Sequence, residues 1–202
     1  MQRAMVFIDF ENFDIAKRTY YKKILGSGCT YPKIDFNTFP RELVKLLLQE
    51  HILIKTFLFA PKPDDFLMQD KTRQSTYNWI SGMKNYDYIT VIEGSHSARP
   101  VPGCEYSDRN INDQKTYYVE EKGTDINLAV HLITKGFLHA YDTAIIISGD
   151  TDYIPALDVL NTIGKTVIIV GIQGQSLFKF KHHSDAQITL DDEFFKKCLR
   201  QN

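Results

Sequence analysis

The segment "TAIIISGDTDYIPALDVLNTIGKTVIIVG" (143–171) places an apolar run on each side of a helical pattern. The runs at 143–149 and 165–171 are rich in isoleucine and valine, and each ends at a glycine. Apolar runs without polar alternation are typical of parallel strands that are covered on both faces. Between them, residues 152–164 begin with an aspartate and end with a glycine, as helices often do. This order predicts a βαβ unit.

The same alternation extends over the rest of the 202 residues. Short apolar runs predict four more strands, at 4–10, 52–60, 86–92 and 186–190. Helical patterns predict four helices in addition to the one at 152–164; they lie at 39–50, 66–84, 125–137 and 191–200. Strands that alternate with helices indicate an α/β fold with a doubly wound, mostly parallel sheet.

One predicted helix and two loops carry more specific expectations. The helix at 125–137 has an apolar stripe at helical spacing, which is typical of a face packed on a core: Ile126, Ala129, Val130, Ile133 and Phe137. The Gly/Pro-bearing segment 25–35 is expected to be a loop that follows the helix nearest the N-terminus. Residues 93–113 exceed the usual length of a βα loop and are expected to form an irregular flap within a single domain over 1–202.

The composition limits the classes of function. Lys and Arg number 24 and Asp and Glu 25, a formal net charge of -1, so a polyanion site has to be a local patch or act through metal ions. Three cysteines without CxxC or Cys/His spacing argue against a disulfide framework and a structural zinc site. A reducing, cytoplasmic setting is expected. No segment approaches the ~20 apolar residues of a membrane helix, and the apolar run at the N-terminus is too short for a signal peptide.

Acidic residues stand where strands end. Asp9 closes the first predicted strand, and Asp150 follows the strand at 143–149, with Asp152 just beyond it. Asp125 begins a helix. Ligands of open α/β sheets bind at the carboxyl ends of the strands, and clustered carboxylates need a compensating cation. Oxygen ligands favour Mg²⁺ or Mn²⁺, which activate water and neutralise phosphoryl charge.

Each acid also has a purely structural explanation. Asp150 or Asp152 can be a helix cap, and Asp125 can stabilise the dipole of the first helical turn. A single D-x-D pattern is a weak signal. Asp9 and Asp150 together, each after an apolar strand, favour a functional site.

Three segments together resemble one known family. "VFIDFENF" (6–13), "EKGTDINLAVHL" (121–132) and "SGDTDYIPALDVLNTIGKTVIIVG" (148–171) are similar to the NYN domain, LabA-like branch, of the PIN-like nuclease superfamily. The segment "SLFKFKHHSDAQITL" (176–190) looks like the closing part of that domain. The resemblance implies a PIN-like three-layer α/β/α sandwich, a divalent-metal site and, in active members, cleavage of RNA.

The resemblance also implies roles for individual residues. Asp9, Asp125 and Asp150 would hold Mg²⁺ or Mn²⁺, directly or through water. Asp152 would complete the acidic cluster or orient a water molecule, and Asn12 would hydrogen-bond a water ligand or a phosphate. The hydroxyls of the same site would come from Ser148 and Thr151.

Two positions near these acids need separate comment. His131 stands where family members commonly carry a further Asp, which removes one charge from the site and is a departure from the family pattern. Lys122 sits beside the acids in the family's "KG" motif, where a lysine can bind a phosphate oxygen or tune the pKa of a carboxylate.

A basic and aromatic segment at 16–23 is the expected contact for nucleic acid. Its cations surround Tyr20 and Tyr21; they are Lys17, Arg18, Lys22 and Lys23. Cations bind phosphates and aromatic rings stack on unpaired bases. A solvated helix face with tyrosines packed on the sheet is the alternative. A second basic and aromatic patch is "FKFKHH" (178–183).

Three functions remain open from the sequence. The first is a Mg²⁺- or Mn²⁺-dependent ribonuclease that cleaves single-stranded RNA. It would have no membrane partner, and the formation of a homo-oligomer is left open. The second is an RNA-binding or regulatory module of the same fold with weak or no activity, which His131 keeps open. The third is a small-molecule phosphohydrolase that uses an aspartyl nucleophile; "DFEN" offers Asp9 and Glu11 but no matching pattern follows. A dehydrogenase is disfavoured because no GxGxxG follows the first strand.

Overall fold

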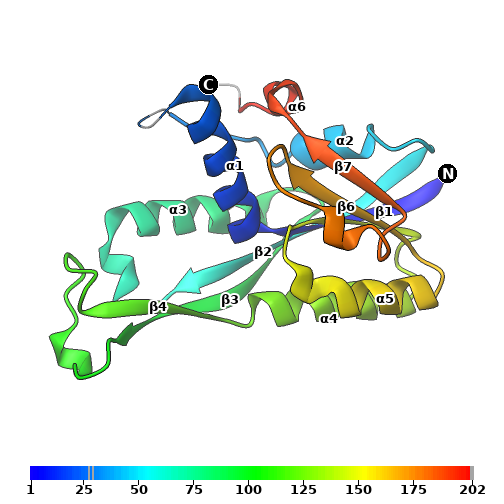
Figure 1. The fold of residues 1–202 in the computed structure, drawn as a ribbon. Coiled ribbons are helices and arrows are strands. Elements are labelled where there is room, and N and C mark those ends of the chain that lie inside the picture. The colour runs from blue at the N-terminus through cyan, green and yellow to red at the C-terminus, as the bar shows by residue number, and fades with distance from the viewer. Residues whose placement is uncertain (27, 29, 201–202) are drawn as a thin grey trace.

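The fold is a seven-stranded sheet with helices on both faces (Figure 1). The computed structural model describes residues 1–26, 28 and 30–200. Cys29 and the last two residues of the predicted 1–202 domain lie outside this part of the chain. Within it, Cys104 and Cys198 are free. None of the described helices has the length and apolar character that a membrane span requires.

The sheet has the order β4-β3-β2-β1-β5-β6-β7. Every neighbouring pair is parallel except β3 with β4. Successive strands run outward from β1 in one direction and from β5 in the other, so the order reverses between these two. The strands are β1 (Gln2–Asp9), β2 (His51–Pro63), β3 (Ile89–Pro100), β4 (Tyr117–Lys122), β5 (Thr143–Ile147), β6 (Thr166–Ile172) and β7 (Ala186–Leu190).

Helices cover the sheet on both sides, which confirms the predicted α/β class and the layered arrangement. On one side lie α1 (Phe10–Leu25), α2 (Phe39–Val44), α3 (Lys71–Gly82) and α6 (Asp192–Lys197). On the other side lie α4 (Thr124–Phe137) and α5 (Ile154–Thr162). Each side of the sheet buries an apolar cluster, one around Phe13, Phe39 and Leu58 and the other around Phe7, Leu132 and Leu157. Both faces of the central strands are therefore apolar, which explains the Ile/Val runs.

The expectation of a wholly irregular flap at 93–113 is wrong for its first part. Residues up to Pro100 continue β3 and pair with β4, a strand that the sequence analysis missed. This ribbon carries polar and half-buried residues and extends past the helices, so it lacks the continuous apolar signal. Turns and the short 3-10 helix η3 (Tyr106–Asp108) connect its two strands.

The predicted apolar stripe on α4 is also wrong in orientation. Leu128 and Leu132 are fully buried, whereas Ile126, Val130 and Phe137 are more than half exposed. Both sets recur at helical spacing, so periodicity alone cannot tell which face packs on the sheet. The helix itself has the expected bounds within one residue.

Two other predicted helices are shorter than expected. The first ends at Val44 rather than at residue 50, and Leu46 and Leu48 beyond it are exposed. In the second, α3 starts only after Asp70, whose carboxylate accepts the backbone N–H groups of Thr72 and Arg73. The 3-10 helices η1 (Leu67–Gln69) and η2 (Met83–Asn85) occupy its predicted ends.

Candidate functional site

The carboxyl ends of β1 and β5 lie side by side at the point where the strand order reverses. Ile8 pairs with Ile147, so Asp9 and Ser148 follow at the same level of the sheet. The Ser148 hydroxyl donates to Asp9 Oδ2 at 3.0 Å. The Asp150 N–H donates to Ser148 Oγ at 3.1 Å. Ser148 thus links the two strand ends, which is where ligands of open α/β sheets bind.

Tyr153 brings Asp125 to the same place. Its hydroxyl oxygen lies 2.6 Å from Asp125 Oδ1 and 3.2 Å from Asp9 Oδ2. A phenol has one proton, so it can donate to only one of these carboxylates at a time. The two carboxylates therefore compete for that proton. The second contact is favourable when Asp9 carries a proton or when a cation neutralises the pair.

The pKa of Asp9 reflects this shortage of positive charge. Burial raises it from 3.8 to about 6, and the Asp125 carboxylate adds to the rise. Hydrogen bonds from the Asn12 N–H, Ser148 and Tyr153 oppose the shift but do not cancel it. The buried Tyr153 has a raised pKa, through burial and the two neighbouring carboxylates. A carboxyl group that is costly to ionise beside a second carboxylate is suited to binding a cation.

Asn12 fixes the turn after β5. Its Oδ1 accepts the Gly149 N–H at 2.9 Å and the Gln175 Nε2–H at 3.3 Å. A Cβ on Gly149 would come within 3.0 Å of that Gln175 nitrogen, so a side chain there would displace the amide. The predicted roles of Asn12 towards water or phosphate stay predictions. Its observed contacts hold the loop that presents Asp150.

Asp150 also acts as a cap. Its carboxylate accepts the Asp152 N–H at 2.9 Å, at the start of the 3-10 helix η4 (Thr151–Tyr153) that precedes α5. The Asp152 side chain is exposed and Thr151 is half-buried. Asp150 is therefore a helix cap, as its structural explanation predicted. The cap uses one carboxylate oxygen and leaves the other for a ligand.

These acids fit a divalent ion in their chemistry. We call Asp9, Asp125 and Asp150 the strand-end acids. They offer carboxylate oxygens from three elements, the ligand type of Mg²⁺ and Mn²⁺. In the described residues their oxygens do not gather as a set of three within 4.8 Å, so an ion would bind them partly through water, as Mg²⁺ usually does.

A second group of ionisable side chains does bring three ligand atoms within 4.8 Å of one another. Glu11, His96 and Glu121 place one ligand atom each within 4.8 Å of one another. His96 Nε2 lies 3.4 Å from Glu11 Oε2 and 3.7 Å from Glu121 Oε2. We call these residues the Glu–His–Glu cluster. His96 and Glu121 are direct partners across β3 and β4, and Glu11 comes from the first turn of α1.

Histidine supplies the positive charge in this cluster. Burial lowers the pKa of His96, but the two glutamates outweigh burial and raise it to about 9. His96 in turn lowers the pKa of Glu121 to about 2 against the effect of burial, with smaller contributions from hydrogen bonding to Glu11 and to the Thr124 hydroxyl. His96 also lowers the pKa of Glu11, but burial and Glu121 outweigh it and leave that pKa raised.

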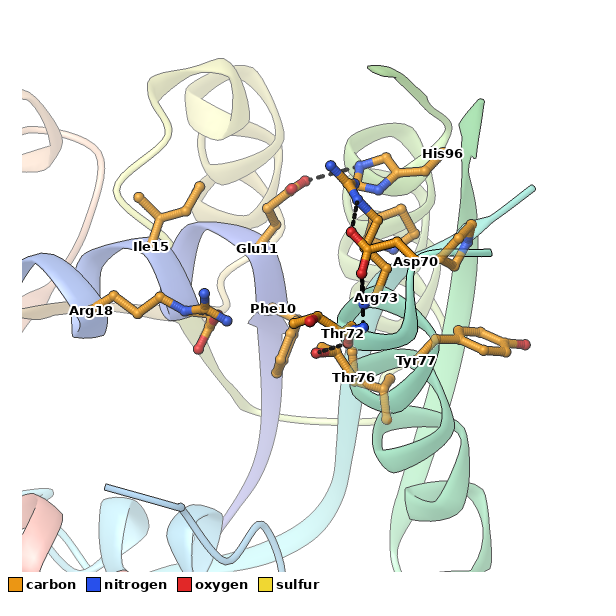
Figure 2. A pocket seen from close by; sticks show the side chains of 14 residues that line it. Phe10, Glu11, Ile15, Arg18, Asp70, Thr72, Arg73, Thr76, Tyr77 and His96 are labelled. Carbon is orange, nitrogen blue, oxygen red and sulfur yellow. Dashed lines mark hydrogen bonds and ion pairs between the residues drawn. The ribbon is translucent and has the colours of Figure 1, made fainter. Parts of the chain in front are cut away.

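A cavity of about 380 Å³ opens beside the Glu–His–Glu cluster (Figure 2). Glu11 and His96 face each other at one side of it. Apolar groups from α1, β2 and α3 form much of the wall, with arginine and tyrosine side chains among them: Phe10, Ile15, Arg18, Pro61, Arg73 and Tyr77.

The predicted basic contacts differ in exposure. Lys17 is buried and lies 3.0 Å from Asp14, which also pairs with Arg18. Lys22 and Lys23 are exposed in the last turn of α1. Lys122 is exposed and pairs with Glu120 at 3.1 Å.

His131 packs in the core layer between α4 and the sheet. Its ring lies 5.3 Å from the ring of Phe57 and 5.6 Å from that of Phe59. Burial, with the charge of Lys135, lowers its pKa. These contacts are those of a packing residue.

Sequence reasoning missed Tyr153, Gln175 and the Glu–His–Glu cluster as a group. Tyr153 directly follows the acids in "SGDTDY", so its position was a usable signal. Glu11 and Glu121 flank acidic motifs, but His96 lies in the segment that was expected to be irregular. The cluster depends on the pairing of β3 with β4, which the sequence did not reveal.

Comparisons with known proteins agree with this architecture. The family model of the NYN domain matches residues 3–196. The crystal structure of a protein of unknown function from Vibrio parahaemolyticus has a TM-score of 0.55 and 16% identity, over 98% of this chain and 96% of that chain. At that identity the likeness shows the fold alone. None of the curated proteins matches this chain.

Proposed function

The chain belongs to the NYN domain family, and on this premise we propose that it is a Mg²⁺- or Mn²⁺-dependent ribonuclease of the LabA-like branch. The PIN-like nuclease fold supports a hydrolase that acts on nucleic acid. The observation that carries the proposal is the contact of one Tyr153 hydroxyl with both Asp9 and Asp125, beside Asp150 at the strand ends.

The strand-end acids would hold the metal. A divalent ion bound there supplies charge neutralisation for a phosphodiester and lowers the pKa of water. Tyr153 and Ser148 orient the Asp9 carboxylate by hydrogen bonds. Asn12 and Gln175 hold the loop that carries Asp150. Such supporting contacts fix the position of ligands and tune their basicity.

Single-stranded RNA would cross the carboxyl ends of the strands. Exposed cations are suited to phosphate: Lys22 and Lys23 in the last turn of α1, and Lys122 at the end of β4. Arg18 lines the cavity beside Glu11, and Lys17 supports it by sharing Asp14. The hydroxyls of Ser148 and Thr151 and the carboxylate of Asp152 complete the proposed contact area. The cytoplasmic location and a homo-oligomer are predictions of the same proposal.

A non-catalytic RNA-binding module is the second candidate. Two observations favour it: in the described part of the chain the strand-end acids do not gather as a set of three within 4.8 Å, and His131 packs against the ring of Phe57. The two candidates differ in one measurable property, because a module would bind RNA in EDTA and release no products.

The test is cleavage of single-stranded RNA by the purified protein. We expect products with Mn²⁺ or Mg²⁺ and none with EDTA. Asp150→Asn should abolish cutting while circular dichroism stays unchanged. Asp87→Asn is the matched control, since Asp87 is exposed in the turn before β3, at the opposite edge of the sheet. Cutting by Asp150→Asn at the parental rate would refute the metal-site assignment.

A further inference from the structure

We propose that Glu11, His96 and Glu121 form a second metal site, which holds a divalent transition-metal ion such as Mn²⁺ or Zn²⁺. The site is separate from the strand-end acids, and it does not depend on the proposed nuclease activity. Three lines of observation carry it: the approach of the ligand atoms, a buried hydroxyl without a partner, and access from the neighbouring cavity.

The ligand atoms are already assembled by the backbone. His96 and Glu121 are paired across the β3–β4 ribbon, and Glu11 is held in the first turn of α1. Mutual distances within 4.8 Å need only small side-chain movements to reach metal–ligand bonds of ~2.0–2.2 Å. His96 is 13% exposed, while Glu11 and Glu121 are about one third exposed, so an ion can reach the site.

Thr124 supplies the second observation. Its hydroxyl oxygen is buried and has no hydrogen-bond partner among the described residues. It lies close enough to Glu121 to help lower the pKa of that carboxyl. A buried hydroxyl without a partner is unfavourable, because it has lost its hydrogen bonds to water. A water molecule on an ion bound by Glu121 would give it one.

The backbone around Thr124 is built for close approach. A Cβ on Gly94 would lie 2.2 Å from Thr124 Oγ1 and 2.7 Å from its backbone nitrogen. Only glycine therefore lets β3 come this near to the turn between β4 and α4. Gly123 in that turn has a φ of 88°, in the left-handed region. These two glycines allow the close backbone approach beside the pair of His96 and Glu121.

The ligand types select the ion. One imidazole nitrogen with two carboxylates suits Mn²⁺ or Zn²⁺, whereas Mg²⁺ prefers an all-oxygen site. Three protein ligands leave a coordination position open. Glu11 and His96 also line the cavity (Figure 2), so that position is accessible to water or to a phosphate oxygen.

The competing explanation is an ion-pair clamp. A protonated His96 between two glutamates would join α1 to the β3–β4 ribbon without any metal. The experiment separates the two by counting bound ions. Mn²⁺ alone is titrated into the metal-free full chain at pH 8, and free Mn²⁺ is measured by electron paramagnetic resonance; Mg²⁺ is titrated separately by calorimetry.

We expect two Mn²⁺ per wild-type chain. His96→Gln should keep the ion at the strand-end acids and weaken the other by tenfold or more, and Asp150→Asn should do the reverse. Glu121→Gln serves as the second variant if His96→Gln unfolds. The matched control is His183→Gln, because His183 pairs with the single carboxylate of Asp158 and should leave the Mn²⁺ count unchanged. Mg²⁺ should not fill the Glu–His–Glu site.

Two outcomes overturn the proposal. One is an equal Mn²⁺ count and affinity in the wild type, His96→Gln and Glu121→Gln. The other is a single ion that Asp150→Asn alone removes, which leaves the proposed nuclease site intact. If the wild type binds one ion that His96→Gln removes and Asp150→Asn does not, this site stands and the proposed nuclease site fails.

Discussion

The strand-end acids and the Glu–His–Glu cluster are two acidic groups that balance their charge differently. Asp9 and Asp125 share one Tyr153 proton, and the pKa of the buried Asp9 rises to about 6. The Glu–His–Glu cluster contains its own cation, since its two glutamates raise the pKa of His96 to about 9. The first group lacks a positive charge and the second already has one.

The strand-end acids can therefore bind a cation directly, whereas the Glu–His–Glu cluster must lose a proton before it can bind one. A metal at the strand-end acids relieves repulsion between carboxylates. A metal at the Glu–His–Glu cluster has to displace the proton of His96. We therefore expect variants of the strand-end acids to affect catalysis most, and variants of the other cluster to affect ion selectivity and stability.

Asp125→Asn tests the catalytic half of the comparison with the largest effect. It removes one carboxylate from the Tyr153 contact, and we expect RNA cleavage with Mn²⁺ to fall by about 100-fold or more, because charge stabilisation by a metal is worth several kcal/mol. Initial rates on a labelled single-stranded RNA measure it. Glu121→Gln is the matched control on the other side of Gly123, and a fall as large as that of Asp125→Asn would contradict the division of roles.

Tyr153→Phe tests whether the shared proton positions the strand-end acids. The ring stays buried, but Asp9 and Asp125 lose their common donor. We expect the rate to fall by about 10- to 100-fold, as for other groups that orient metal ligands. Because the Tyr153 hydroxyl lowers the pKa of Asp9, the acid limb of the pH–rate profile should also move to higher pH. A lower rate with an unmoved acid limb would indicate a structural defect only.

The sequence predicts the strand-end acids because they depend on local rules. Asp9 and Asp150 directly follow apolar strands, and the carboxyl ends of neighbouring parallel strands must meet. Chain order also predicts the central strands and the layers. Tyr153 was predictable in position but not in role, since its two contacts depend on how α4 packs against β1.

The Glu–His–Glu cluster could not be predicted in the same way. It needs the antiparallel pairing of His96 with Glu121, and the polar β3–β4 ribbon has no continuous apolar pattern to reveal that pairing. The orientation of α4 failed for a related reason. Leu128 and Leu132 repeat at the same helical spacing as exposed Ile126 and Val130, so only the packed structure distinguishes the two faces.

Asp9→Asn tests whether the ionised Asp9 carboxylate destabilises the metal-free fold. The raised pKa means that ionisation of Asp9 costs the wild type no stability below about pH 4, and that this cost appears as the pH rises through about 6. An amide avoids that cost and still caps α1. In EDTA at pH 8 we expect the variant to gain ~1–2 kcal/mol of unfolding free energy, measured by urea denaturation. The gain should disappear near pH 4, and a gain of equal size at both pH values would contradict the assignment to ionisation.

His96→Gln tests the internal cation with the smallest effect. In EDTA at pH 6 the variant should lose ~1 kcal/mol or less of unfolding free energy, because partly exposed carboxylates are screened by solvent. The ordinary pKa of 6.5 is raised to about 9 in the fold, so the stabilisation is complete below about pH 6.5 and is lost as the pH rises through about 9. The difference from the wild type should therefore shrink by pH 9.5. His183→Gln should cost less at pH 6, since Asp158, its ion-pair partner among the described residues, is 54% exposed. Equal losses of unfolding free energy in the two variants would mean that His96 forms only an ordinary surface ion pair. In that case the strand-end acids and the Glu–His–Glu cluster would not differ in how their charge is balanced.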